Sequence, residues 1–320
     1  MAVLAVFNPE HDLCLANGNA HYVPPRSARD FARSHAEMMR WMFDDKCVTT
    51  DVEKAGDAYR RMIDAGVSSS SIVVEAWGWD SAVWNRLSKA GIPEALLPDN
   101  SFVQEVKRLS HRAACLPLQP RVMALHLLAD VEQQVFDLGD AVLKAPWSGS
   151  GRGLRWVSRK LSQHDIHWAS KVLLSQGAVM VEPRYHVVQD FAAEFHADRS
   201  GKVSFVGWSL FETSNGVYRG NRLLDDNEIV EALSRWVPRT EIEAMDDVVA
   251  HLQHLCQGGY CGPIGVDMFV YEDFDGFHVN HCVEANFRYT MGMVASSFLR
   301  KHRECHGNTL FQSPGLLFHV

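Results

Sequence analysis

The chain has 320 residues, of which 31 are Lys or Arg and 39 are Asp or Glu, so its net charge is −8. A chain of this length normally forms about two or three packed domains with sizeable cores. The acidic balance leaves no broad positive field for a phosphodiester backbone, so we do not expect nucleic acid as a partner. A hydrophobic content of 47% is ordinary for a globular protein and argues against a disordered or fibrous chain.

The sequence carries no sign of export or of membrane insertion. The first apolar run, residues 2–7, is too short for the core of a signal peptide and is followed at once by polar residues. An uninterrupted stretch of about 18 apolar residues does not occur, so we expect no membrane contact. The seven cysteines are scattered and odd in number, which indicates reduced thiols rather than a disulfide framework. These features predict a cytoplasmic protein.

The first third of the chain alternates strand and helix signals. Residues 2–7 and 71–77 are short apolar runs with β-branched side chains, while residues 27–43 carry apolar side chains near helical spacing. Short buried strands separated by helices predict a parallel α/β layer. Residues from about 98 to 138 are then expected to be mostly helical, including 101–115.

From residue 141 onward, strands follow one another through turn signals, which is typical of an antiparallel α+β arrangement. The expected strands cover residues 141–145, 154–157, 178–181, 190–196, 203–213 and 217–224. Two helices, a last strand pair and a final helix follow at 226–237, 240–257, 262–271, 277–286 and 291–301. The predicted fold class is therefore α/β plus α+β.

The strongest local signal is an acidic hairpin near the end of the chain. A two-residue turn at Asp275-Gly276 would place Asp267 directly opposite Glu284. Asn286 shares their face, and Gly265 opposite it leaves room for a bulky ligand. Facing carboxylates repel unless a cation lies between them, and oxygen ligands favour a hard ion such as magnesium. Two solvated carboxylates on an exposed face are the alternative, and spacing alone leaves both interpretations open.

A glycine-rich segment over residues 142–157 is the second signal, with Lys144 on the entering strand and Ser148-Gly149-Ser150-Gly151 at its centre. It lacks the Gly-Lys-Ser/Thr ending of a Walker loop, and a dinucleotide fingerprint should open a helix rather than the strand expected at 154–157. A glycine-rich hairpin remains, whose backbone N–H groups can fold over phosphates while the lysine supplies charge. The alternative is a surface hairpin without a ligand.

Two weaker signals accompany these. In residues 179–185 an apolar strand ends in an acid, Glu182, and Asp190 opens the next strand. Alone, this indicates only a strand end and a turn. The dipeptide Asn215-Gly216 predicts a turn that pairs Glu212 with Arg219, so Arg219 can be a simple cross-strand partner.

In this order, the four features resemble the ATP-grasp superfamily, which includes D-alanine ligase, glutathione synthetase and the carboxylases that use biotin. The resemblance covers roughly residues 98–300, and its most specific part is 265–267 with 284–292, similar to the family's magnesium strands and its Glu-x-Asn-x-Arg sequence. It implies an N-terminal α/β domain over residues 1–97 and an ATP-grasp domain over 98–320. The two α+β subdomains of the latter would cover about 98–182 and 183–320, with the nucleotide between them.

The resemblance also implies roles for single residues. Magnesium would be held by Asp267, Glu284 and Asn286, and charge on the transferred phosphoryl or the carboxylate would be stabilised by Arg219 and Arg288. The implied nucleotide contacts are Lys144 and the hairpin residues Ser148, Gly149, Ser150 and Gly151 at the phosphates, Glu182, Pro183 and Tyr185 as the adenine hinge, and Asp190 at the ribose. Arg112 stands where the family often has a lysine, so its place in the nucleotide site is a departure from the pattern.

The implied activity is an ATP- and magnesium-dependent ligation of a carboxylate to an amine through an acyl phosphate. Kinase-type phosphoryl transfer and a non-catalytic ATP-binding regulatory protein are the alternatives, and a homodimer stays open. Substrate contacts are expected partly from strand ends of the first domain, where the candidates are Asn8, Glu10, His11, Arg26, Trp77, Trp79 and Asp80.

One further cluster, formed by His251, His254, Cys256 and Cys261, could be drawn as a zinc site. The spacing argues against it, because Cys256 is rotated away from the helix face of the two histidines and no Cys-x-x-Cys pair is present.

Overall fold

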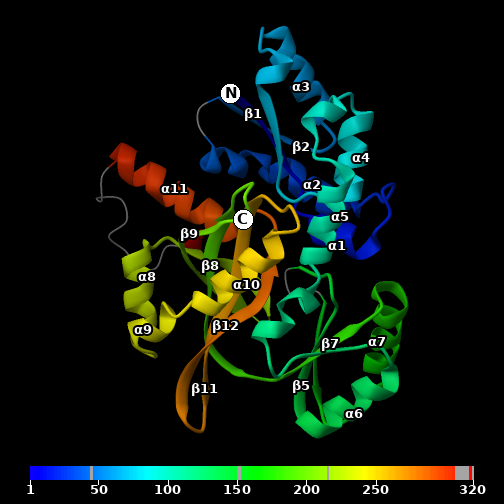
Figure 1. Cartoon of the computed structure of the whole chain (residues 1–320), viewed down its shortest axis with the longest axis vertical. Coiled ribbons are helices and arrows are strands. Elements are labelled where there is room, and N and C mark those ends of the chain that lie inside the picture. Colours follow the sequence, from blue (N-terminus) through cyan, green and yellow to red (C-terminus); the bar gives the residue numbers. More distant parts are fainter. Residues whose placement is uncertain (44–45, 150–152, 215, 307–316, 319–320) are drawn as a thin grey trace.

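The computed structural model describes residues 1–43, 46–149, 153–214, 216–306 and 317–318. Its strands form three sheets: a three-stranded sheet in the order β2-β1-β3, a four-stranded sheet in the order β4-β7-β5-β6, and a six-stranded sheet in the order β12-β11-β8-β9-β10-β13. Figure 1 shows the first sheet and its helices at the top, the second at the lower right and the third in the centre. The predicted α/β layer followed by two α+β parts is confirmed.

The N-terminal layer is a parallel sheet with helices on both faces. Its elements are β1 (Ala2–Phe7), α1 (His11–Asn17), α2 (Arg26–His35), η1 (Ala36–Met42), β2 (Cys47–Asp51), α3 (Ala55–Asp64), η2 (Ser69–Ser71), β3 (Ile72–Ala76), α4 (Ser81–Lys89) and η3 (Glu94–Leu96). The next two helices, α5 (Asn100–Leu109) and η4 (Arg112–Leu118), pack into the core of the six-stranded sheet. The helix predicted over 27–43 divides at His35, whose backbone leaves the helical region (φ −120°, ψ 8°), into α2 and the 3-10 helix η1. Strand β2 was not predicted.

A helix from the far end of the chain completes this layer. One face of the sheet buries Leu4 and Val6 together with Ala58 and Leu87 of α3 and α4. The other face buries Phe7 with residues of α2 and η1, and with Val294 of α11 (Met291–His306). Figure 1 shows α11 lying beside the N-terminal layer. The first domain therefore packs as one body with residues that lie almost three hundred positions later.

The four-stranded sheet is antiparallel and has two helices packed into its core. It contains β4 (Met123–Leu125), α6 (Leu128–Leu138), β5 (Asp140–Lys144), β6 (Leu154–Ser158), α7 (Gln163–Gln176) and β7 (Val179–Pro183). Helix α7 begins at a capping box in which Ser162 and Asp165 satisfy each other's backbone N–H, and it ends at Gly177 with a left-handed φ of 80°. Strand β4 lies in a stretch that was expected to be helical.

The six-stranded sheet has one apolar face and one polar face. Its elements are β8 (His186–Ala197), β9 (Val203–Ser214), β10 (Val217–Arg222), α8 (Asp226–Leu233), α9 (Arg239–Ile242), α10 (Asp246–Cys256), β11 (Gly262–Asp273), β12 (Gly276–Asn286) and β13 (Leu317–Phe318). Phe191, Phe195 and Val266 belong to the largest core cluster, with α8 and α10. Because strand side chains alternate, Glu194 and Asp267 project to the opposite face.

The β11–β12 hairpin reaches the predicted pairing by an unexpected route. Asp273 pairs with Gly276, so the turn is centred on residues 274–275, one position earlier than predicted. Asp273 Oδ1 accepts a hydrogen bond of 2.9 Å from the Asp275 N–H, which favours this turn. The register then shifts between Phe269 and Asp267, and this shift restores the predicted pairing of Asp267 with Glu284.

The β9–β10 hairpin behaves in the opposite way. Ser214 pairs with Val217, which agrees with the predicted turn position. The register then shifts after Tyr218, so Glu212 pairs with Gly220 and the predicted pairing with Arg219 is wrong. The Glu212 carboxylate instead accepts a hydrogen bond of 3.0 Å from Arg222 Nε.

None of the helices in the described ranges combines the length and the apolar character that crossing a bilayer requires.

Candidate functional site

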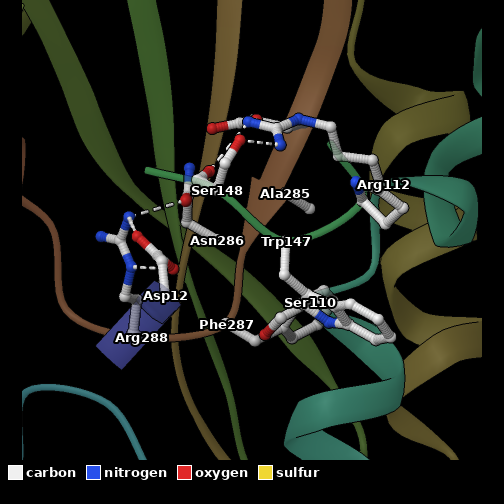
Figure 2. Close-up of a pocket in the computed structure, with 11 residues that line it drawn as sticks. Asp12, Ser110, Arg112, Trp147, Ser148, Ala285, Asn286, Phe287 and Arg288 are labelled. Carbon is white, nitrogen blue, oxygen red and sulfur yellow. Dashed lines mark hydrogen bonds and ion pairs between the residues drawn. The ribbon is translucent and has the colours of Figure 1, made fainter. Parts of the chain in front are cut away.

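Four separate parts of the chain line a pocket. Asp12 comes from α1, Arg112 from the start of η4, and Ser148 from the loop after β5. The fourth wall is the end of β12 and the segment after it, residues 284–288. Figure 2 shows Asn286 between the Asp12–Arg288 pair on one side and Arg112 with Ser148 on the other.

Of the facing acids of β11 and β12, Glu284 lines this pocket and Asp267 lies beside it on β11. Asp267 lies opposite Glu284, and Asn286 Nδ2 donates a hydrogen bond of 3.3 Å to Asp267 Oδ2, so the three side chains share a face as predicted. Burial and the negative charge of Glu284 raise the pKa of Asp267 well above its usual range. The folded protein therefore favours a proton on Asp267 unless a cation lies between the two carboxyl groups.

Arg112 links the glycine-rich segment to the acidic strand. Its guanidinium donates to the Ala145 carbonyl at 2.6 Å, to Ser148 Oγ at 2.7 Å and to the Ser148 carbonyl at 3.0 Å. The same group forms an ion pair with Glu284. The arginine that departs from the family pattern thus supplies positive charge to the Glu284 carboxylate and fixes the loop after β5.

Arg288 joins the first domain to the acidic strand. Its Nη2 donates to Asp12 Oδ2 at 3.1 Å and to Asn286 Oδ1 at 2.9 Å, and its Nη1 donates to the Tyr289 carbonyl at 3.1 Å. Burial acts to raise the pKa of Asp12, but the charges of Arg288, His11 and Arg112 together with the hydrogen bond from Arg288 outweigh it, and the net shift is downward. The guanidinium is thereby held in place between two carboxylate-bearing segments.

Lys144 does not project freely toward the glycine-rich segment. It is 6% exposed, Glu182 is 8% exposed, and Lys144 Nζ lies 2.6 Å from Glu182 Oε1. The two residues come from neighbouring strands β5 and β7. The two charges are buried together, so removing either side chain would leave the other charge buried without a partner.

The predicted adenine hinge lies where the two antiparallel sheets meet. Pro183 ends β7, and the Tyr185 ring lies 5.3 Å from the Phe269 ring and 4.8 Å from the Tyr271 ring, centroid to centroid. Asp190, on β8, accepts a hydrogen bond of 2.7 Å from Thr213 Oγ1, and burial raises its pKa.

The structure does not bring every predicted residue to the pocket. Arg219 is exposed on β10 and does not line it. The other predicted residues in the described ranges that do not line it are Lys144, Gly149, Glu182, Pro183, Tyr185, Asp190 and Asp267. Ser150 and Gly151 lie outside the described residues. Gly149 approaches the first domain closely, because a Cβ added there would lie 2.1 Å from Asp12 Oδ2.

Gly265 does not leave space for a ligand, which corrects the sequence-based expectation. A Cβ added at Gly265 would lie 2.4 Å from Thr290 Cγ2 and 2.9 Å from Glu194 Oε2, so protein side chains fill this space. Glu194 was not predicted as a site residue. Its Oε1 accepts a hydrogen bond of 2.9 Å from Thr290 Oγ1, its Oε2 has no such partner among the described residues, and burial raises its pKa to about 7.

Asp12 is the other site residue that was missed. The only signal for it is its place in the polar run after the first strand, from which Asn8, Glu10 and His11 were singled out. These three are buried, whereas the Arg26 side chain is 87% exposed.

The donor set suits a hard cation. Asp267 and Glu284 offer carboxylate oxygens, Asn286 offers an amide oxygen, and the raised pKa of Asp267 reflects negative charge that a cation would relieve. In the described part of the chain, no group of three or more His, Cys, Asp and Glu side chains is arranged around a common point. A metal here would therefore have two acidic ligands, with the amide as the third.

In the cluster that could be drawn as a zinc site, His251 Nε2 lies 2.7 Å from the Ala114 carbonyl oxygen.

No protein-family model matches the sequence, and no curated protein matches it either. Solved structures do resemble it. N5-carboxyaminoimidazole synthetase from Staphylococcus aureus, complexed with ADP, is 11% identical with a TM-score of 0.48, over 93% of this chain and 76% of that one. The biotin carboxylase–β-γ-ATP complex from Campylobacter jejuni is 12% identical with a TM-score of 0.49, over 92% and 67%. D-cycloserine synthetase is 13% identical with a TM-score of 0.44, over 94% and 99%. At such distances the likeness carries no assignment, and the function has to be argued from the side chains of this chain.

Proposed function

We propose that this protein is an ATP-grasp ligase that uses ATP and magnesium to join a carboxylate to an amine. The observation that supports this most is the convergence of Asp267, Glu284, Asn286 and Arg288 beside a pocket that the loop after β5 closes. On a solvated acidic face, Glu284 would not pair with a largely buried arginine, Arg112, and burial would not raise the pKa of Asp267.

The nucleotide is assigned to the space between the four-stranded and the six-stranded sheet. Its adenine would contact the backbone of Pro183 and Tyr185, and its ribose would contact Asp190. Lys144 and the backbone of Gly149 would contact the phosphates. To do so, the Lys144 ammonium would leave the Glu182 carboxylate and bind a phosphate oxygen instead. The Ser150 and Gly151 contacts belong to the same proposal.

Magnesium is assigned to Asp267, Glu284 and Asn286, and when bound it would neutralise charge on the phosphates. Arg112 already lies against Glu284 and Ser148, so it can turn from the carboxylate to a phosphate oxygen over a short distance. A guanidinium binds phosphate through two parallel hydrogen bonds, which suits this position.

The proposed reaction has two steps. A carboxylate oxygen of the first substrate attacks the γ-phosphorus of ATP, the bond to the β-phosphate oxygen breaks, and ADP leaves. The amine nitrogen then attacks the carbonyl carbon of the acyl phosphate, inorganic phosphate leaves, and the nitrogen loses a proton. Arg288 would hold the carboxylate and stabilise the charge that develops on it. Arg219 is exposed on β10 and does not line the pocket, so we expect it to contribute less than Arg288 to this stabilisation.

The test is ADP release with ATP, magnesium and pools of carboxylates and amines, with the product mass measured and Asp267→Asn as the inactive control. Ligation gives ADP, phosphate and a product lighter than its two substrates by one water. A phosphorylated product would indicate a kinase instead, and ATP binding without ADP release would indicate a regulatory protein. The reaction would take place in the cytoplasm, which the free thiols of the described cysteines favour.

A further inference from the structure

A second pocket adjoins the first. The two pockets share Phe287 and Arg288. The second pocket lies between the end of β3 in the first domain and the start of β11 in the six-stranded sheet, with α5 along one side. No step proposed above uses it.

Its walls carry several aromatic rings. Those that line it are Trp77, Trp79, Phe102, Tyr260, Phe287 and Tyr289, and the His196 imidazole lines it as well. Phe102 stacks on Tyr260 with centroids 5.7 Å apart and an interplanar angle of 10°, and Tyr260 meets Phe287 edge-on at 5.0 Å. Such walls favour a flat apolar body and attract a cation to the faces of the rings.

One carboxyl group lies among these rings. Glu75, near the end of β3, lines the pocket, and the Tyr289 hydroxyl is its hydrogen-bond partner. Burial raises the pKa of Glu75 to about 7. Arg288 also lines this pocket, but its charge is paired with Asp12. The charge of Glu75 is therefore the one that a ligand inside the pocket would complement.

Buried polar groups hold the β3 side of the pocket in place. Asn8 Nδ2 donates to the Gly78 carbonyl at 2.8 Å, and the Trp77 carbonyl accepts from the Tyr289 N–H at 2.9 Å. His11 Nδ1 lies 3.1 Å from Asp80 Oδ2, and a Cβ at Gly78 would lie 2.6 Å from the His11 ring. These contacts explain why the polar residues after β1 are buried, since they position the backbone from which Trp77 and Trp79 project.

We propose that this pocket binds an amine with a flat, apolar body, its ammonium group on Glu75 and its body against Trp79 and the neighbouring rings. That such an amine is the nucleophile of the ligation rests on the proposed function. The shared wall of Phe287 and Arg288 would bring it next to the carboxylate that is activated in the first pocket. The binding itself requires neither ATP nor turnover.

The test is calorimetric titration of the whole protein, without ATP, with 2-phenylethylamine and tryptamine. Their carboxylate counterparts, 3-phenylpropionate and indole-3-propionate, are titrated in parallel. We expect the amines to bind and the acids to bind at least tenfold more weakly. Affinity for the amines should rise with pH up to about 7, as Glu75 ionises, because an alkylamine is protonated throughout that range.

Two variants decide whether the pocket is the site. Glu75→Gln keeps the hydrogen bond to Tyr289 and should weaken amine binding at least tenfold and remove its pH dependence. Trp79→Ala, at a partly exposed position, should weaken it as well, and the exposed control Glu132→Gln should leave it unchanged. Preference for the acids, or an unchanged affinity in both pocket variants, would overturn the proposal.

The outcome separates this inference from the proposed ligase activity. Amine binding that depends on Glu75, in a protein that never hydrolyses ATP, would support the pocket and contradict the ligase. Ligation whose KM for the amine is unchanged in Glu75→Gln would support the ligase and contradict the pocket.

Discussion

Two hairpins of the six-stranded sheet, β9–β10 and β11–β12, show how a turn signal succeeds and fails. In β9–β10 the turn lies where its Asn-Gly dipeptide predicts, yet the pairing expected at Arg219 is lost further along the strand. In β11–β12 the turn lies one residue earlier than its Asp-Gly dipeptide predicts, yet Asp267 still pairs with Glu284.

The difference lies in the size of the register shift. In β11–β12 the pairing passes from Phe269–Asn280 to Asp267–Glu284, so β12 advances four residues while β11 advances two. A shift of two keeps every side chain on its face, because strands alternate with a period of two. In β9–β10 the shift at Arg219 is a single residue, which changes the pairing partner. A turn dipeptide therefore does not fix the pairing several residues away, because an irregularity in either strand can remove the predicted pair or restore it.

The largest expected effect belongs to the acids of β11–β12. Asp267→Asn and Glu284→Gln should each lower ATP-dependent turnover at least about 100-fold, since a cation on a phosphoryl group is worth several kcal/mol. Without metal, the two substitutions should have different effects on the free energy of unfolding. Asp267→Asn should be neutral or stabilising because burial and Glu284 oppose the ionisation of this carboxyl, whereas Glu284→Gln should be destabilising because it breaks the pair with Arg112. Thermal unfolding in EDTA measures this; identical shifts for the two variants would contradict the arrangement.

Arg288 should follow closely in effect on catalysis. Arg288→Lys keeps the charge but cannot reach Asp12 and Asn286 with the same planar geometry, so turnover should fall roughly 100-fold. The matched control is Arg219→Lys in the other hairpin, which should change turnover less than about threefold. A larger loss of turnover in Arg219→Lys than in Arg288→Lys would contradict the main role given to Arg288.

Lys144 provides a test outside both hairpins. Lys144→Met leaves Glu182 buried without its partner and should lower the free energy of unfolding by about 3 to 5 kcal/mol. Adding Glu182→Gln should restore much of this stability. ATP affinity should stay roughly ten- to a hundredfold weaker in the double variant, because the phosphate contact is still missing. Recovery of ATP affinity together with stability would remove Lys144 from the nucleotide site.

Glu194 lies on β8, the strand that both hairpins flank, and it should affect stability rather than turnover. Its pKa of about 7 lies above the usual 4.5, so the folded state binds more protons between these pH values and stability falls as pH rises through them. Glu194→Gln should reduce this fall by up to roughly 3 kcal/mol, measured as unfolding free energy at pH 4.5 and pH 7.5. An unchanged pH profile would show that Glu194 is not buried as described.

The sequence alone determined most of the strands and the presence of the acidic face. β1 spans the residues predicted for it, and β5, β6, β11 and β12 fall within a few residues of their predicted bounds. Alternation of apolar and polar residues and the turn dipeptides are local properties, so they can be recognised without knowing what packs against a strand. The same local character explains the error at Gly265, whose free space is taken by Thr290 and Glu194 from other segments.

Only the tertiary structure decided which segments meet at the pockets. Asp12 contacts Arg288 across 276 positions, Gln119 bonds the Val283 carbonyl across 164, and Val294 packs under the first sheet. None of these contacts leaves a periodic signature, because each depends on how whole sheets and helices pack rather than on the spacing of neighbours along the chain. The aromatic pocket beside Glu75 has the same origin, since its walls come from β3, α5 and the strands of the six-stranded sheet. The local sequence of each segment determines which side chains it carries, and the packing of the domains decides which other side chains they contact.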